Sequence, residues 1–154
     1  MEINSALLTV FNSTIYNNYI LYNNIGLQIS HSSSNLVYNN YFNNFKNVLI
    51  QGKCTNRWNI TKTPGKNIVG GPYIAGNYWA TSSGTGFSQV TPDKNGDGLC
   101  DSPYKITTNN TDYLPLSLNY SVITPPVPEN PTSALVVLGF VVAATAMERG
   151  RFRF

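Results

Sequence analysis

Acidic side chains are scarce in this sequence and unevenly placed. The 154-residue chain has seven Asp and Glu against ten Lys and Arg, and 11% of its residues are charged. No carboxylate side chain occurs between residues 3 and 92. Hydrolysis of glycosidic bonds needs two positioned carboxylates, so this stretch lacks most routes to that chemistry. The seven acids are Glu2, Asp93, Asp97, Asp101, Asp112, Glu129 and Glu148.

Metal-binding and disulfide-forming residues are also few. The chain has two cysteines and one histidine, His31, which excludes a disulfide-dense scaffold and a four-cysteine zinc site. The formal net charge of +3 is too small to indicate nucleic-acid binding. The first residues lack the basic and apolar regions of a signal peptide.

Asparagine is the residue that the chain has in excess. It has 21 Asn and 10 Tyr, a composition that argues against a helical protein. Residues 16–19, Tyr-Asn-Asn-Tyr, recur at 38–41, and residues 26–29 align with 47–50. A period of 21 to 22 residues predicts a repeat architecture. Leucine-rich repeats share this period, but their leucine spacing is absent.

The repeated units are short apolar alternations separated by Asn-rich or Ser-rich turns. Asparagine tolerates the left-handed backbone conformation that tight turns need. We therefore predict an all-β fold, a parallel β-helix (solenoid) with about three short strands in each turn of chain. Asn side chains at equivalent turns are expected to form hydrogen-bonded ladders. The apolar residues expected to face inward are Ile15, Leu27, Ile29, Val37, Val48 and Ile50.

Composition divides the chain into four parts. We expect β-helix coils over residues 1–60, a loop-rich C-terminal cap over 61–120, a Pro-rich linker over 121–133, and a short apolar helix with a basic tail over 134–154. The apolar run at 134–147 is shorter than the 17 to 25 residues of a membrane span. It nevertheless resembles a C-terminal anchor or sorting signal, the alternative being a buried helix. Because the repeat begins abruptly, we expect a fragment of a longer secreted protein.

Several motifs occur in a fixed order, at residues 35–44, 58–73, 76–79, 84–88, 93–104 and 112–116. Together they resemble the C-terminal part of the NosD-like β-helix proteins of methanogenic archaeal surfaces, over residues 12–118. This resemblance implies a right-handed helix and an extracellular or cell-surface location. Residues 128–132, Pro-Glu-Asn-Pro-Thr, are similar to the start of an archaeal sorting signal.

The acidic loop at residues 93–101 is the strongest candidate for a cofactor site, and the cofactor is calcium. Calcium prefers oxygen ligands on a tight loop, and Gly98 permits the sharp turn. The bidentate glutamate of an EF-hand is missing, because Tyr104 stands at its position. The candidate ligands are Asp93, Asn95, Asp97, the Leu99 carbonyl and Asp101, with Asp112 or a backbone carbonyl to complete the shell. The alternative is an Asp/Gly turn that binds no ion.

Three further sets of residues are candidates for other roles. In an extracellular protein Cys54 and Cys100 would form one disulfide, the alternative being two free buried thiols. Tyr73, Tyr78 and Trp79 would either stack on sugar rings or cover the end of the repeat. N-glycosylation sequons begin at Asn12, Asn59, Asn109 and Asn119.

Two classes of function remain open. The first is a non-catalytic surface module, an adhesin or envelope protein, that carries a structural calcium site and binds an envelope glycan or a surface protein. The second is a carbohydrate-active enzyme, a polysaccharide lyase, epimerase or hydrolase, whose active site lies in coils outside this chain. The NosD-like resemblance adds copper handling as a third reading. Copper sites favour Cys, Met and His, of which the chain has two, two and one.

Overall fold

The computed structural model describes residues 5–8 and 12–118. The chain separates into two units, residues 1–121 and 122–154, and the second unit lies outside the described residues. The predicted linker at 121–133, the apolar segment at 134–154 and the sequon at Asn119 lie outside them as well.

The described residues form short strands and one helical turn, which confirms the all-β class. The elements are β1 (Ser5–Leu8), β2 (Thr14–Tyr16), β3 (Tyr19–Leu21), β4 (Ile25–Ser30), β5 (Leu36–Tyr38), β6 (Tyr41–Asn43), β7 (Lys46–Gln51), β8 (Thr63–Pro64), β9 (Tyr73–Ile74), β10 (Tyr78–Ala80), α1 (Phe87–Val90), β11 (Tyr104–Thr107) and β12 (Asn110–Asp112).

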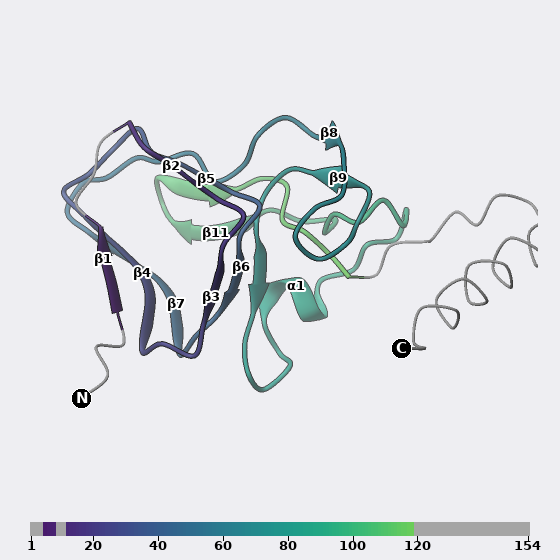
Figure 1. The fold of residues 1–154 in the computed structure, drawn as a ribbon, viewed down its shortest axis with the longest axis horizontal. Helices are drawn as coiled ribbons and strands as arrows, with labels where there is room; N and C mark the ends of the chain where they lie inside the picture. Colours follow the sequence, from purple (N-terminus) through teal and green to yellow (C-terminus); the bar gives the residue numbers. More distant parts are fainter. Residues whose placement is uncertain (1–4, 9–11, 119–154) are drawn as a thin grey trace, which may run out of the picture. The chain divides into compact units, whose positions relative to one another are not determined.

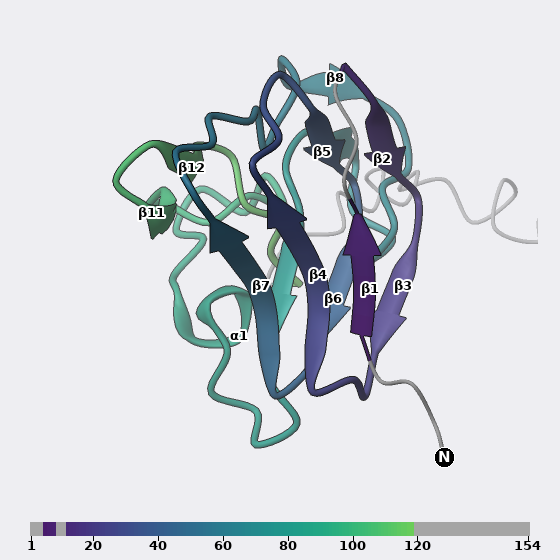
Figure 2. The same ribbon diagram turned by 90° about the vertical axis from the view of Figure 1, so that its left-hand side faces the viewer.

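Strands one repeat apart lie side by side and run parallel. They form the stacks β1–β4–β7, β3–β6–β10 and β2–β5, which lie on three sides of one interior (Figure 1). Figure 2 shows β1, β4 and β7 side by side. Tyr19 pairs with Tyr41 and Leu27 with Val48, so the register follows the period read from the sequence. Among described strands β1 to β7 every pairing is parallel.

The third repeat departs from this regularity. Asn18 and Asn40, which occupy equivalent positions, are 22 residues apart, whereas Asn40 and its next equivalent, Asn77, are 37 residues apart. The additional residues contain the antiparallel pair β8–β9. After them β10 joins the stack beside β6, although its residues belong to the predicted cap. The antiparallel hairpin β11–β12 follows.

The core collects apolar side chains from all three stacks. Leu27, Ile29 and Val37 are 2% exposed or less, as predicted. The other residues predicted to face inward are partly buried and pack against them; they are Ile15, Val48 and Ile50. The same cluster contains Phe42 and Trp79, whose rings stack at a centroid distance of 4.7 Å and an angle of 5°. Because aromatic side chains bury the largest apolar areas, their burial contributes most to the stability of a small core.

Three ladders of asparagine side chains run along the stacks, as the sequence predicts. In the first ladder, Oδ1 of Asn40 accepts hydrogen bonds from the backbone N–H and the Nδ2 of Asn18, at 3.1 and 3.0 Å. Oδ1 of Asn77 accepts the same pair from Asn40, at 3.2 and 3.0 Å. The other two ladders repeat this pattern through Asn23, Asn44 and Asn47 and through Asn35, Asn56 and Asn110.

Asparagine also forms corners of the repeat, again as predicted. Asn12, Asn17 and Asn39 have φ angles of 53°, 60° and 52°, in the left-handed region. Asn17 and Asn39 stand at equivalent positions of successive repeats. Their short amide side chains tolerate this backbone conformation, which most residues avoid.

Substitution of a ladder residue is expected to destabilise the fold strongly. Asn40 is fully buried, and its Nδ2 also donates to the carbonyl groups of Ile15 and Tyr38. Asn40→Ala leaves these buried groups unpaired, so the free energy of unfolding should fall by about 3 kcal/mol in urea denaturation. Asn24→Ala, at an exposed position outside the ladders, is the matched control and should change it by less than about 0.5 kcal/mol. Equal effects of the two substitutions would contradict a structural role of the ladder.

Candidate functional site

The acidic loop is held together by its own backbone. The two carboxylate oxygens of Asp93 accept hydrogen bonds from the backbone N–H groups of Asp97 and Gly98, at 3.1 and 2.8 Å. Oδ1 of Asp97 accepts one from the N–H of Leu99 at 3.0 Å, and Oδ2 of Asp101 accepts one from Lys94 at 3.1 Å. The loop therefore uses its acids to satisfy its own N–H groups.

A lysine from a distant segment neutralises part of this charge. Nζ of Lys62 lies 2.7 Å from Oδ2 of Asp97. Nδ2 of Asn95 donates to the same oxygen at 3.3 Å. Among the described residues no group of three or more His, Cys, Asp and Glu side chains is placed to hold a metal ion. In this structure Lys62 and the loop N–H groups contact the carboxylate oxygens that the sequence suggested as calcium ligands.

Asp112 lies in the core and not in the loop. Its Oδ2 accepts hydrogen bonds from the backbone N–H of Asn77 at 2.7 Å and from Nε1 of Trp79 at 2.9 Å. Its Oδ1 accepts one from the N–H of Leu114 at 3.2 Å. The carboxylate of Asp112 can occupy this site only because residue 76 is glycine. A Cβ at residue 76 would collide with the carboxylate. Asp112 therefore ends the first ladder, which corrects its assignment as a ligand that completes the loop.

Burial dominates the electrostatics of Asp112. Its side chain is fully inaccessible to solvent. Burial raises the pKa of this carboxyl to about 7, against the lowering effect of the N–H groups of Asn77, Trp79 and Leu114. Burial likewise raises the pKa of the nearby Cys100 thiol to about 12. The thiol stays neutral at physiological pH, so it is a poor nucleophile and a poor metal ligand.

The two cysteines do not form the predicted disulfide. Cys54 and Cys100 are both free and buried. The Cys54 thiol belongs to the first hydrophobic cluster and donates to the carbonyl of Gln51 at 3.1 Å. The Cys100 thiol instead donates to the carbonyl of Leu116, in the second cluster, at 3.4 Å. The chain thus buries the two thiols among different neighbours.

Two of the three predicted sugar-stacking rings are inaccessible. Tyr78 and Trp79, on the terminal strand β10 of their stack, are each 1% exposed, because Tyr78 packs on Tyr41 and Trp79 packs on Phe42 and Tyr104. They therefore cover the end of the repeat, the other role that the sequence allowed. Tyr73 is half-buried, and Nζ of Lys62 lies 4.0 Å from the centroid of its ring. This contact is a cation–π interaction and occupies the ring.

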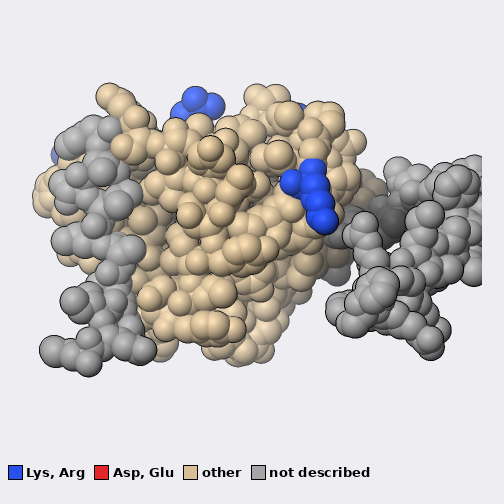
Figure 3. Space-filling view, in the orientation of Figure 1, with Lys and Arg blue, Asp and Glu red and all other residues tan. Residues whose placement is uncertain are grey.

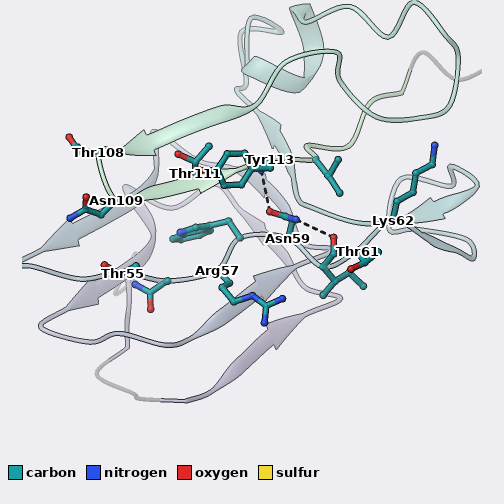
Figure 4. A pocket seen from close by; sticks show the side chains of 13 residues that line it. Thr55, Arg57, Asn59, Thr61, Lys62, Thr108, Asn109, Thr111 and Tyr113 are labelled. Carbon is teal, nitrogen blue, oxygen red and sulfur yellow. Dashed lines mark hydrogen bonds between the residues drawn. The ribbon is translucent and has the colours of Figure 1, made fainter.

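The described surface contains instead a groove of about 700 Å³. Figure 4 shows the residues that line it in two rows, one from the segment 55–62 and one from the hairpin β11–β12 and the residues that follow it. Tyr113 is 68% exposed, and its backbone N–H donates to Oδ1 of Asn59 at 3.2 Å, which joins the rows. Sequence reasoning missed this site, because its rows are 50 residues apart in the chain.

The groove has a mixed polar and apolar lining and carries positive charge. Arg57 is exposed in its first row, Lys62 stands at the end of that row, and none of the described residues that line the groove is Asp or Glu. The remaining lining residues are mostly hydroxyl and amide side chains. On the face drawn in Figure 3 the charged side chains of the described residues are Lys and Arg. Such a cavity is in the size range of small-ligand sites and favours a polar, anionic ligand.

Two of the predicted glycosylation sequons border this groove. Asn109 is exposed, as is Asn12 elsewhere on the surface. Asn59 is partly buried and has both amide atoms in use, since its Nδ2 donates to the carbonyl of Ile60 at 3.1 Å.

A family model described as periplasmic copper-binding protein (NosD) matches residues 5–84, more than half of the chain. The chain belongs to the NosD family. The match covers the parallel stacks and part of the irregular third repeat. No curated protein and no solved structure matches the chain. The family is described as periplasmic, which agrees with a location outside the cytoplasm. None of the described helices is long and apolar enough to span a membrane.

The possible copper ligands among the described residues of this NosD-family chain are not arranged as a copper site. Copper sites use His, Cys and Met. Nδ1 of His31 lies 3.0 Å from Oγ of Ser30, on the surface. The thiols of Cys54 and Cys100 are buried and bonded to backbone carbonyls. Both methionines lie outside the described residues. The described His and Cys side chains thus already have hydrogen-bond partners and are not grouped around one point.

Asp112 should make stability depend on pH. The pKa of its carboxyl is about 7 in the folded chain and about 4 in the unfolded chain, so the folded state holds the proton to higher pH. Stability should therefore fall as pH rises from about 4 to about 7. In urea denaturation the wild type should lose roughly 3 kcal/mol between pH 5 and pH 8 beyond the loss seen for Asp112→Asn. Parallel pH profiles of the two proteins would contradict the burial of an ionisable group here.

Proposed function

We propose that this chain is a non-catalytic binding module of the cell envelope, built on a right-handed parallel β-helix. The groove beside Tyr113 is the observation that carries this proposal. It is large enough for a ligand, lies on the surface and is lined by hydroxyl, amide and apolar side chains, with no carboxylate among the described residues. Carbohydrate is the ligand class that such a lining fits, because hydroxyl and amide groups pair with sugar hydroxyls and an exposed tyrosine ring packs on a sugar face.

Parallel pairing supports the β-helix. The pairings among β2 to β7 keep a spacing of 21 to 22 residues, and three asparagine ladders run along the same stacks. Membership of the NosD family agrees with this architecture. The likeness of the motifs to methanogenic archaeal surface proteins supports a role as an adhesin or envelope protein. Anchoring through residues 134–154 is part of the proposal and falls outside the described residues.

The use of the described acids supports a binding role over catalysis. Asp112 is buried beneath Asn77, and Asp97 is paired with Lys62. Asp93 and Asp101 accept hydrogen bonds from backbone N–H groups of the loop. Acid–base hydrolysis of a glycan needs a pair of carboxylates on either side of the bond.

We further propose that the loop at 93–101 binds calcium in competition with Lys62. The loop offers carboxylate and amide oxygens within nine residues, and calcium is the cation that prefers such ligands. Binding would require Asp97 to exchange the Lys62 ammonium for the ion. The site is therefore weak, with a Kd of about 10⁻⁴ to 10⁻³ M, as in extracellular modules.

Calcium should raise the melting temperature of the wild type. With 10 mM calcium against a chelator, the rise should be roughly 4 °C. Asp97→Ala should abolish the shift, Lys94→Ala should preserve it, and Lys62→Gln should enlarge it by removing the competing cation. An unchanged midpoint in the wild type would reject the site, and a shift that survives in Asp97→Ala would place it elsewhere.

The binding function is tested with insoluble polysaccharide from a prokaryotic cell envelope. The full chain should sediment with the polysaccharide and release no soluble sugar. Thr111→Trp, in the floor of the groove, should reduce retention about tenfold by filling the cavity, whatever the ligand's charge. Thr14→Trp, at an exposed position of β2, is the matched control and should leave retention unchanged. Release of sugar would indicate an enzyme, and a lack of retention would refute the proposed function.

A further inference from the structure

We propose that the groove binds an acidic oligosaccharide, whose uronate carboxylate pairs with Arg57 and whose ring packs on Tyr113. This inference rests on the proposed function and names the chemical class of its ligand. It assigns the groove a sign of charge, one anchoring cation and one stacking platform, which the shape of the cavity alone does not give.

The backbone places the polar residues of each row on one face. Burial alternates along residues 54–58, where Cys54, Asn56 and Trp58 are buried and the residues between them are exposed. Side chains two positions apart in an extended chain point the same way, about 6.6 Å apart. The row from Arg57 to Thr61 therefore spans about 13 Å. The facing row alternates in the same way, with Asn109 and Tyr113 exposed on either side of a partly buried Thr111.

Arg57 supplies the charge that selects the ligand. The ion pair found within residues 5–8 and 12–118 is that of Lys62 with Asp97, so the Arg57 guanidinium has no carboxylate partner there. Its backbone N–H donates to the carbonyl of Asn35 at 2.8 Å, which fixes the base of the side chain. A guanidinium binds a carboxylate through two parallel hydrogen bonds. A uronate carboxylate satisfies both donors, whereas a neutral sugar does not.

Tyr113 supplies the platform. Its ring is exposed while its backbone is held on both sides, by the hydrogen bond to Asn59 and by the buried Asp112. An exposed aromatic ring on a fixed backbone loses little entropy when a sugar packs on it. Elsewhere along the groove, Thr55, Thr108 and Asn109 offer hydroxyl and amide groups for sugar hydroxyls. One cation without a carboxylate partner among the described residues fits an acidic glycan better than a nucleic acid, which needs several cations along its backbone.

Titration calorimetry at low ionic strength tests this assignment. The full chain, produced in a host without N-glycosylation so that Asn109 stays unmodified, is titrated with tetragalacturonate and with neutral cellotetraose. Tetragalacturonate should bind, and added salt should weaken it; cellotetraose should bind at least tenfold more weakly. Arg57→Gln should reduce the affinity for tetragalacturonate roughly tenfold, and Tyr113→Ala roughly fivefold. Both side chains are exposed, so melting temperatures should be unchanged.

Matched controls locate the effect in the groove. Lys46→Gln removes an exposed positive charge outside it, and Tyr22→Ala removes a tyrosine that is 78% exposed elsewhere. Neither should change the affinity more than twofold. Equal binding of the two tetrasaccharides, no binding of tetragalacturonate, or equal effects of Arg57→Gln and Lys46→Gln would overturn the assignment. If the wild-type protein were still retained on envelope polysaccharide, the proposed binding function would stand and only the acidic ligand class would fail. If it were not retained, both proposals would fail.

Discussion

The two-sided hydrogen bonding of the asparagine amide is the interaction on which the rest of this structure depends. Asn40 shows the pattern: its Oδ1 accepts two N–H groups of Asn18 in the preceding repeat, and its Nδ2 donates to Asn77 in the following one. A corner that turns the chain leaves backbone groups without strand partners, and these must still be paired when buried. Asparagine meets this need at Asn40 and Asn44, and the same residue type provides the left-handed corners at Asn17 and Asn39.

A ladder in which every amide donates in the same direction must end on an acceptor. The first ladder ends on the carboxylate of Asp112, which accepts from both nitrogens of Asn77. A carboxylate accepts without donating, so it closes the series where another amide would need a further partner. The cost is a buried acid with a pKa of about 7. The approach of Gly76, where no Cβ intervenes, makes the arrangement fit.

The candidate sites lie where the repeat loses its regularity. The third repeat contains the additional pair β8–β9, and the hairpin β11–β12 follows it. Residues 55–62 and 108–114, which are far apart in the chain, therefore line one groove. A rigid stack thus positions irregular segments, which carry polar and charged side chains at its end. Lys62 links this region to the acidic loop through Asp97, so calcium in that loop would free a cation at the edge of the groove.

The sequence by itself determined the repeat, because a strict spacing of Asn and apolar residues requires equivalent surroundings in each turn. The period, the parallel register of Ile15 on Val37, the inward side chains and the ladders were all predicted from residue type and spacing. Only the tertiary structure decided where residues outside the periodic pattern lie. Asp112 lies in the core and Trp79 is covered, while Tyr113 and Arg57, 56 residues apart in the chain, line the same groove. These outcomes depend on contacts between segments distant in sequence, which no local pattern encodes.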